Sequence, residues 1–150
     1  MKLTVRIVLS LAVAAGLAVA AKSLAVKDLP PAVQKTVQEQ TKGAEVKNIA
    51  KETEKGVTQY EVETLVNGKH RDFNVDSKGG LIVVEEQVAI DSIPALAKAA
   101  IQKTVGTGRL GMVETVTRAG ITLYEAAYTT KAGKKLAVLV KADGTETKDQ

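Results

Sequence analysis

The sequence predicts an α+β protein made of two tandem repeats, in each of which a helix packs on an antiparallel β-meander of three or four strands. Three observations lead to this prediction. Residue matches recur in the same order in the two halves of the chain. In each half, apolar residues change from a helical spacing to the alternation typical of strands. Turn signals that contain glycine separate the alternating segments.

The repeat is visible in short matching segments. Leu29-Pro30 recurs as Ile93-Pro94, and Tyr60-Glu61 recurs as Tyr124-Glu125. After one inserted residue in a predicted turn the matches continue, pairing Gly68 with Gly133, Val75 with Val140 and Gly79 with Gly144. Chance could explain one matching pair, but not a series of matches in the same order that is interrupted by a single inserted residue. The sequence therefore predicts a duplication, with repeats at residues 21–87 and 88–150.

Each repeat is expected to begin with a helix. Pro30 and Pro94 lie where proline is favoured, near the first helical positions. Val33 and Val37 then follow at helical spacing in the first repeat. Gly43 ends the first helix, and the glycines of residues 106–108 end the second.

Four strands are predicted after each helix. In the first repeat they cover residues 45–52, 57–66, 69–75 and 81–86. In the second repeat they cover residues 109–117, 121–129, 134–140 and 145–148. Asn67-Gly68 is a strong signal for a two-residue hairpin turn. Tyr60 and Val62 alternate with polar residues, so the helix should cover the strand face that carries them.

The first twenty residues predict a signal peptide. Lys2 and Arg6 precede an apolar run that ends in Ala18-Val19-Ala20, which has small residues where signal peptidase requires them. Cleavage is expected before Ala21 or Lys22, and an uncleaved membrane anchor is the alternative. No cysteine follows the run, which excludes a lipoprotein anchor. We expect an exported protein, periplasmic or extracellular, that touches the membrane only if the signal peptide stays uncleaved.

Composition excludes several kinds of chemistry. The chain has no cysteine, so disulfides, thiolate catalysis and cysteine-ligated zinc are excluded. A single histidine, His70, does not make a histidine-rich metal site or a conventional Ser-His triad. Loss of Lys2 and Arg6 with the signal peptide lowers the net charge from +4 to +2, and the remaining charges alternate in sign. We therefore expect no enzyme, no catalytic residues, no cofactor, no bound metal and no nucleic-acid partner.

Isolated polar residues are best explained as structural. His70 is expected to be a solvated strand residue. Asp76 and Asp143 precede glycines but lack the additional carboxylates of a calcium loop, so they are expected to be turn aspartates. Tyr60 and Tyr124 are expected to pack in the core beneath the helices.

One predicted strand face of the second repeat is unexpectedly apolar. In the first repeat, the face away from the helix is polar and carries Glu61, Glu63, His70, Asp72 and Asn74. The equivalent face of the second repeat carries apolar residues interrupted by one glutamate, namely Leu123, Glu125, Ala127, Ala137 and Leu139. A sheet face that meets only water should be polar. Either a partner or a second copy of the chain covers this face, or the register is wrong by one residue, which would exchange the two faces.

Three motifs resemble those of PepSY-like domains. They are Tyr60-Glu61-Val62-Glu63, Asn67-Gly68-Lys69 and Phe73-Asn74-Val75-Asp76. Two such units in tandem are similar to the fold of the β-lactamase inhibitor protein. The second copy departs from the pattern, since Lys141 stands where the first has Asp76. The resemblance implies a secreted or periplasmic module that binds or inhibits proteins, often proteases, and it brings no catalytic residues.

The sequence thus predicts an exported, non-enzymatic module that binds or inhibits a protein. The expected partner is an unidentified hydrolase or envelope component, or a second copy of the same chain. The alternative is a structural, self-assembling protein of the envelope, because exposed strand edges would serve that role as well.

Overall fold

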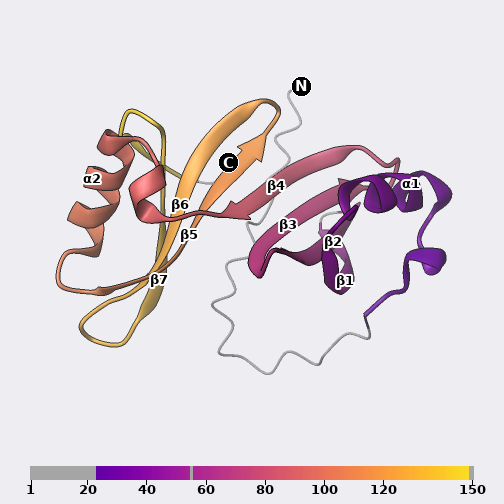
Figure 1. Cartoon of the computed structure of the whole chain (residues 1–150), viewed down its shortest axis with the longest axis horizontal. Coiled ribbons are helices and arrows are strands. Elements are labelled where there is room, and N and C mark those ends of the chain that lie inside the picture. Colours follow the sequence, from indigo (N-terminus) through magenta and orange to yellow (C-terminus); the bar gives the residue numbers. More distant parts are fainter. Residues whose placement is uncertain (1–22, 55, 149–150) are drawn as a thin grey trace. The chain divides into compact units, whose positions relative to one another are not determined.

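The structure, a computed structural model, describes residues 23–54 and 56–148 (Figure 1). Eight strands form one sheet in the order β1-β2-β3-β4-β5-β6-β7-β8. The described part of the chain contains two α-helices. The fold is therefore mainly β, and the predicted fold class, an α+β pair of separate helix-on-meander repeats, is wrong. The predicted signal peptide at residues 1–20 lies outside the described residues.

The prediction of two separate meanders was wrong because each meander would end in a strand with an unpaired edge. A four-stranded meander leaves a row of unpaired backbone N–H and C=O groups along its last strand. Pairing with the next strand in the chain satisfies these groups. Side-chain patterns predict how many strands there are, but they carry no signal for which edges pair, so the continuous sheet was not predicted. The helices are also short, at 10 and 11 residues.

The chain divides into two compact units. The N-terminal unit comprises residues 23–87 with Val116–Ile121, and the C-terminal unit comprises Val88–Thr115 with residues 122–148. The duplication and its boundary between residues 87 and 88 stay predictions.

In the N-terminal unit, a helix precedes four antiparallel strands. The elements are η1 (Val26–Asp28), α1 (Pro31–Gln40), β1 (Glu45–Glu54), β2 (Val57–Val66), β3 (Lys69–Asp76) and β4 (Leu81–Gln87). Asn67 and Gly68 have positive φ angles of 52° and 78°, as a type I′ turn requires. The predicted hairpin between β2 and β3 is therefore confirmed. Pro30 occupies the N-cap and Pro31 the first helical position, one residue later than predicted.

The C-terminal unit repeats this order of elements. They are η2 (Ile90–Ser92), α2 (Ala95–Val105), β5 (Arg109–Arg118), β6 (Ile121–Thr129), β7 (Lys135–Val140) and β8 (Glu146–Thr147). The last three residues of β5 belong to the N-terminal unit by their contacts. Pro94 is the N-cap of α2, and Gly106 follows the last helical residue with a positive φ of 53°.

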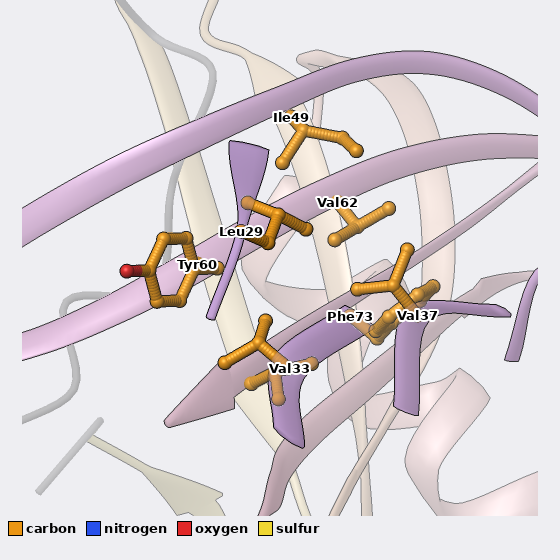
Figure 2. Close-up of a cluster of buried hydrophobic side chains, with 8 residues drawn as sticks. Leu29, Val33, Val37, Ile49, Tyr60, Val62 and Phe73 are labelled. Carbon is orange, nitrogen blue, oxygen red and sulfur yellow. The ribbon is translucent and has the colours of Figure 1, made fainter. Parts of the chain in front are cut away.

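The core of the N-terminal unit lies between α1 and one face of β1–β4. Val33 and Val37 of α1 are fully buried and face Val62 and Phe73 of the strands (Figure 2). Tyr60 lies at the margin of this cluster and is 6% exposed. The prediction that the helix covers the face of Tyr60 and Val62 is confirmed.

The core of the C-terminal unit is built in the same way with smaller side chains. Ala97 and Ile101 of α2 are fully buried and belong to one cluster with Ala126, Val138 and Val140. β6 and β7 are antiparallel, and their register pairs Ala126 with Val138.

A glycine brings a strand turn against each helix. A Cβ atom on Gly79 would lie 2.6 Å from the carbonyl oxygen of Ala32, and one on Gly144 would lie 2.8 Å from that of Leu96. Both glycines also have positive φ angles, of 87° and 83°. These positions therefore require glycine for conformation and for space. Beside Gly79, the Thr36 hydroxyl donates a hydrogen bond of 2.7 Å to the Gly79 carbonyl.

Gly144→Ala should destabilise the protein much more than Gly133→Ala. Both glycines have a φ of 83°, so both substitutions impose a similar backbone strain of roughly 1–2 kcal/mol. Only Gly144 lies against a helix, whereas a Cβ on Gly133 would meet nothing within 4 Å. Urea unfolding of the two variants measures the difference. Equal losses would contradict the close approach of the β7–β8 turn to α2.

Candidate functional site

The residues of the predicted partner surface lie on one face of β6 and β7. The register pairs Glu125 with Leu139 and Ala127 with Ala137. Leu123 lies two residues before Glu125 on the same strand, and alternation gives it the same face. Their neighbours Val138 and Val140 belong to the core beneath α2. The register inferred from the sequence thus agrees with the structure.

These five residues differ in exposure. Leu139 is 8% exposed and Glu125 is 7% exposed. Leu123, Ala127 and Ala137 are half-buried. The accessible part of this face is therefore limited to three side chains, and its role as a partner surface stays a prediction.

The corresponding face of the N-terminal unit is acidic. We call it the acidic sheet face, and its carboxylates come from all four strands, namely Glu52, Glu61, Glu63, Asp72 and Glu85. The register places these carboxylates in neighbouring rows. Asp72 is paired with Glu85 on β4, and the pairing of Val62 with Phe73 places Glu63 opposite Asp72 on the other side. On β1–β4, the residues paired with these carboxylates include no Lys or Arg.

Several of these carboxylates have a local hydrogen-bond donor. Glu63 Oε1 accepts from Asn48 Nδ2 at 3.1 Å, and Glu52 Oε2 accepts from Gln59 Nε2 at 3.0 Å. Asp72 Oδ1 accepts from the backbone amide of Thr64 at 2.8 Å. Glu61 and Glu85 also take part in polar or electrostatic interactions. The carboxylates are therefore held in defined positions.

Asp72, on the acidic sheet face, has a perturbed pKa. Burial raises the pKa of its carboxyl above the ordinary value of 3.8, and the negative charge of Glu63 raises it further. The Thr64 amide and His70 act in the opposite direction without cancelling the rise. His70 Nδ1 lies 3.8 Å from Asp72 Oδ2, and the His70 side chain is 49% exposed. Ionised Asp72 is thus a source of electrostatic strain in the folded protein.

Asn74 lies on the same face, between Glu61 on β2 and Val83 on β4. It is a polar residue that is only 7% exposed. Its partner on β4, Val83, is 2% exposed. This part of the face is therefore largely buried, in contrast to the partly exposed carboxylates beside it.

Sequence reasoning placed Glu61, Glu63, His70, Asp72 and Asn74 on a polar face but assigned them no function. It missed Glu52 and Glu85, because the pairing of β1 and β4 with their neighbours depends on bulges near Val46 and Asn74. The burial of Asn74 has no sequence signal. The alternation of side chains along β3 predicts only that Asn74 faces away from the helix, where a side chain is expected to be exposed.

The remaining candidate residues have structural roles. Asp76 Oδ1 accepts from the amides of Lys78 and Gly80. Asp143 Oδ1 accepts from the Thr145 amide at 2.9 Å, and this hydrogen bond lowers the pKa of Asp143. Both are turn aspartates, as predicted. Within residues 23–54 and 56–148, no cluster of three or more His, Asp or Glu side chains is arranged to hold a metal ion.

No family model and no curated protein matches the sequence significantly. Three solved Bacteroides structures are similar in fold. A protein of B. eggerthii described as periplasmic has a TM-score of 0.65 and 17% identity, over 81% of this chain and 88% of its own. A DUF2874 family protein of B. ovatus has a TM-score of 0.62 and 15% identity, over 80% and 85%.

The third is a protein of B. fragilis that is like the β-lactamase inhibitor protein, with a TM-score of 0.58 and 14% identity over 81% of this chain and 85% of its own. At these identities the likeness concerns the fold alone. The chain therefore has a fold like that of the β-lactamase inhibitor protein, as the sequence motifs suggested. The PepSY-like relationship is not established by these comparisons.

Asp72→Asn should become more stabilising, relative to wild type, as pH rises above 3.8. Because folding raises the pKa of Asp72, the folded state binds its proton more tightly than the unfolded state does. Wild type therefore loses stability between 3.8 and the higher pKa of the folded protein, while the variant does not. The side-chain oxygen of the introduced asparagine can still accept from the Thr64 amide. Urea unfolding at a series of pH values measures the difference.

Asp143→Asn is the matched control, with the opposite sign. The pKa of Asp143 is lowered in the folded protein, so its ionisation contributes stability that is lost as pH falls through that lowered pKa. Asp143→Asn should therefore be no more stable than wild type at neutral pH. The same pH trend in both variants would contradict the assignment of strain to Asp72.

Proposed function

We propose that this chain is an exported, non-enzymatic module that binds another protein through the sheet face opposite its helices. The observation that carries the proposal is the arrangement of Glu63, Asp72 and Glu85 across three adjacent strands. Like charges directly opposite each other on adjacent strands destabilise a sheet. Features that oppose stability in an otherwise consistent fold are expected at functional positions.

Two observations support export. The first twenty residues have the pattern of a signal peptide, and one of the proteins that share the fold is described as periplasmic. Among the described residues, neither helix has the length and hydropathy needed to cross a bilayer. We place the mature chain in the periplasm or outside the cell.

The arrangement around His70 supports a role without catalysis. His70 lies near Asp72, and the hydroxyl residue that contacts the same carboxylate is Thr64. The Thr64 hydroxyl donates to the Arg71 carbonyl oxygen rather than to His70. A nucleophile needs a base within hydrogen-bonding distance, and this group of residues does not provide that pair.

We further propose that the chain is related to PepSY-like domains and that its partner is a protease or another envelope protein. The three motifs that carry the resemblance occupy β2, the turn after it and β3. Phe73 and Val75 of the third motif are core residues, while Asn74 belongs to the acidic sheet face. The motifs therefore include residues of both the scaffold and the proposed binding face.

Capture of a partner from the native envelope fraction tests the proposal. The mature protein is immobilised beside three variants: Glu63→Lys on the acidic sheet face, Leu123→Lys on the β6–β7 face, and Leu96→Lys on α2. Leu96 is 63% exposed and lies on a helix, so its variant is the matched control. We expect one specific protein to be retained by wild type and Leu96→Lys and lost from at least one sheet-face variant.

Two outcomes would contradict protein binding through the sheet. One is a partner that all three variants retain equally. The other is the absence of any retained protein together with elution of wild type as a larger species in size-exclusion chromatography. The second outcome would favour the structural, self-assembling alternative.

A further inference from the structure

We propose that Ser23 and Leu24 form an edge cap that keeps β1 from pairing with β1 of a second copy of the chain. The inference goes beyond the proposed function and does not depend on it, because it concerns the edge of the sheet rather than its faces. It follows from the hydrogen bonds of Ile49, from the same contact in the C-terminal unit, and from the lengths of the two terminal strands.

The outer edge of β1 is capped at Ile49. β1 is the first strand in the sheet order, so among the described residues it has a neighbouring strand on one side only. The Leu24 amide donates a hydrogen bond of 2.9 Å to the Ile49 carbonyl oxygen. The Ile49 amide donates one of 3.1 Å to Ser23 Oγ. Both backbone groups of Ile49 therefore point away from β2 and bond to residues of the same chain.

The cap leaves only a short open edge beyond it. Along an antiparallel strand, the backbone groups of alternate residues point to the same side, so those of Lys51 and Thr53 also point away from β2. Neither residue forms a backbone hydrogen bond to the described residues on that side. Without the cap, the open edge would extend over residues 49–53, close to the typical strand length of about five or six residues. An open edge of this length is a template for pairing with another chain.

The same contact recurs at a place where the sheet continues. Val88 lies 64 residues after Leu24, which is the offset of the predicted repeat. Its amide donates a hydrogen bond of 2.9 Å to the carbonyl oxygen of Val113, which lies 64 residues after Ile49. Val88 directly follows β4, the neighbour of β5 in the sheet. The edge of β1 thus corresponds to an edge that accepts a strand, and the cap occupies the place where that strand would end.

The residues that follow the cap hold it in place. Leu24 and Val26 are partly buried and pack against the core of the N-terminal unit. Gln34 Nε2 of α1 donates a hydrogen bond of 2.8 Å to the carbonyl oxygen of Leu29, which is itself a core residue. Because the cap is attached to a fixed segment, it competes with a second chain at a high effective concentration. Cleavage of the signal peptide at either expected position leaves Ser23 in the mature chain.

A second copy of the chain is the occupant that an uncapped edge would take. Every copy presents the same β1, which has ten residues. The strand at the opposite end of the sheet, β8, has only two residues and is too short to extend the sheet of another copy. Two antiparallel β1 strands would form an isologous interface, which is closed, so the expected product is a dimer.

Size-exclusion chromatography with light scattering, over a range of concentrations of the mature protein, tests the inference. The uncapped variant carries Ser23→Ala, which removes the side-chain acceptor, and Leu24→Pro, which removes the backbone N–H. We expect wild type to elute as a monomer, and the uncapped variant to approach about twice the monomer mass as its concentration rises. Leu24→Ala is the matched control, because it keeps the amide and removes only packing. It should unfold at a lower urea concentration than wild type and remain a monomer.

A further substitution locates the association on β1. Lys51→Pro removes an N–H group that points away from β2, a position at which an edge strand tolerates proline. Added to the uncapped variant, Lys51→Pro should restore the monomer, because the edge then lacks a donor in the middle of residues 49–53. A cooperative urea transition of this monomer would show that the chain still folds, so that association of the uncapped variant is not caused by misfolding.

The inference is overturned if the uncapped variant stays monomeric, if its association persists with Lys51→Pro, or if wild type associates as strongly as the uncapped variant. An uncapped variant that is monomeric but retains an envelope protein that wild type does not retain would assign the edge to a different partner, and would also overturn it. The proposed function fails separately, since its test uses Glu63→Lys and Leu123→Lys on the faces of the sheet with the cap intact.

Discussion

The structure depends most on the alternation of side chains along hydrogen-bonded strands. Phe73 is fully buried beneath α1, and the next residue, Asn74, faces the opposite side of the sheet. A shift of register by one residue would exchange these two faces. The Asn67-Gly68 turn, with both φ angles positive, fixes the pairing of β2 with β3. Core and acidic sheet face are therefore set by the same short turn.

The two units have the same order of elements but differ in the polarity of the sheet face away from the helix. In the predicted repeat alignment, Glu63, Asp72 and Asn74 correspond to Ala127, Ala137 and Leu139. Both Asn74 and Leu139 are more than nine-tenths buried. The core beneath each helix keeps its apolar character in both units. The outward positions, which packing under the helix does not constrain, are the ones that differ, so any difference in binding between the units should arise there.

The sequence predicted local structure well and the sheet as a whole poorly. The alternation of Tyr60 and Val62 and the glycine turns located the strands, because these patterns reflect interactions between residues close in the chain. The single eight-stranded sheet depends on pairing between strand edges, and backbone hydrogen bonds leave no side-chain pattern. For the same reason the face of Glu61, Glu63 and Asp72 was predicted as polar, while the contribution of Glu85 from β4 and the burial of Asn74 were not.

A sheet can carry an unfavourable row of carboxylates only if its other face compensates. Phe73 and Val62 are fully buried on the side of α1, and each such side chain stabilises the fold by about 1.5–3 kcal/mol. Repulsion between opposed like charges costs only about 0.2–1 kcal/mol per pair. The strands that hold Glu63 and Asp72 in place are thus stabilised by residues adjacent to them in the chain. Because the core fixes the backbone of these strands, Glu63 and Asp72 remain on adjacent strands despite their like charges.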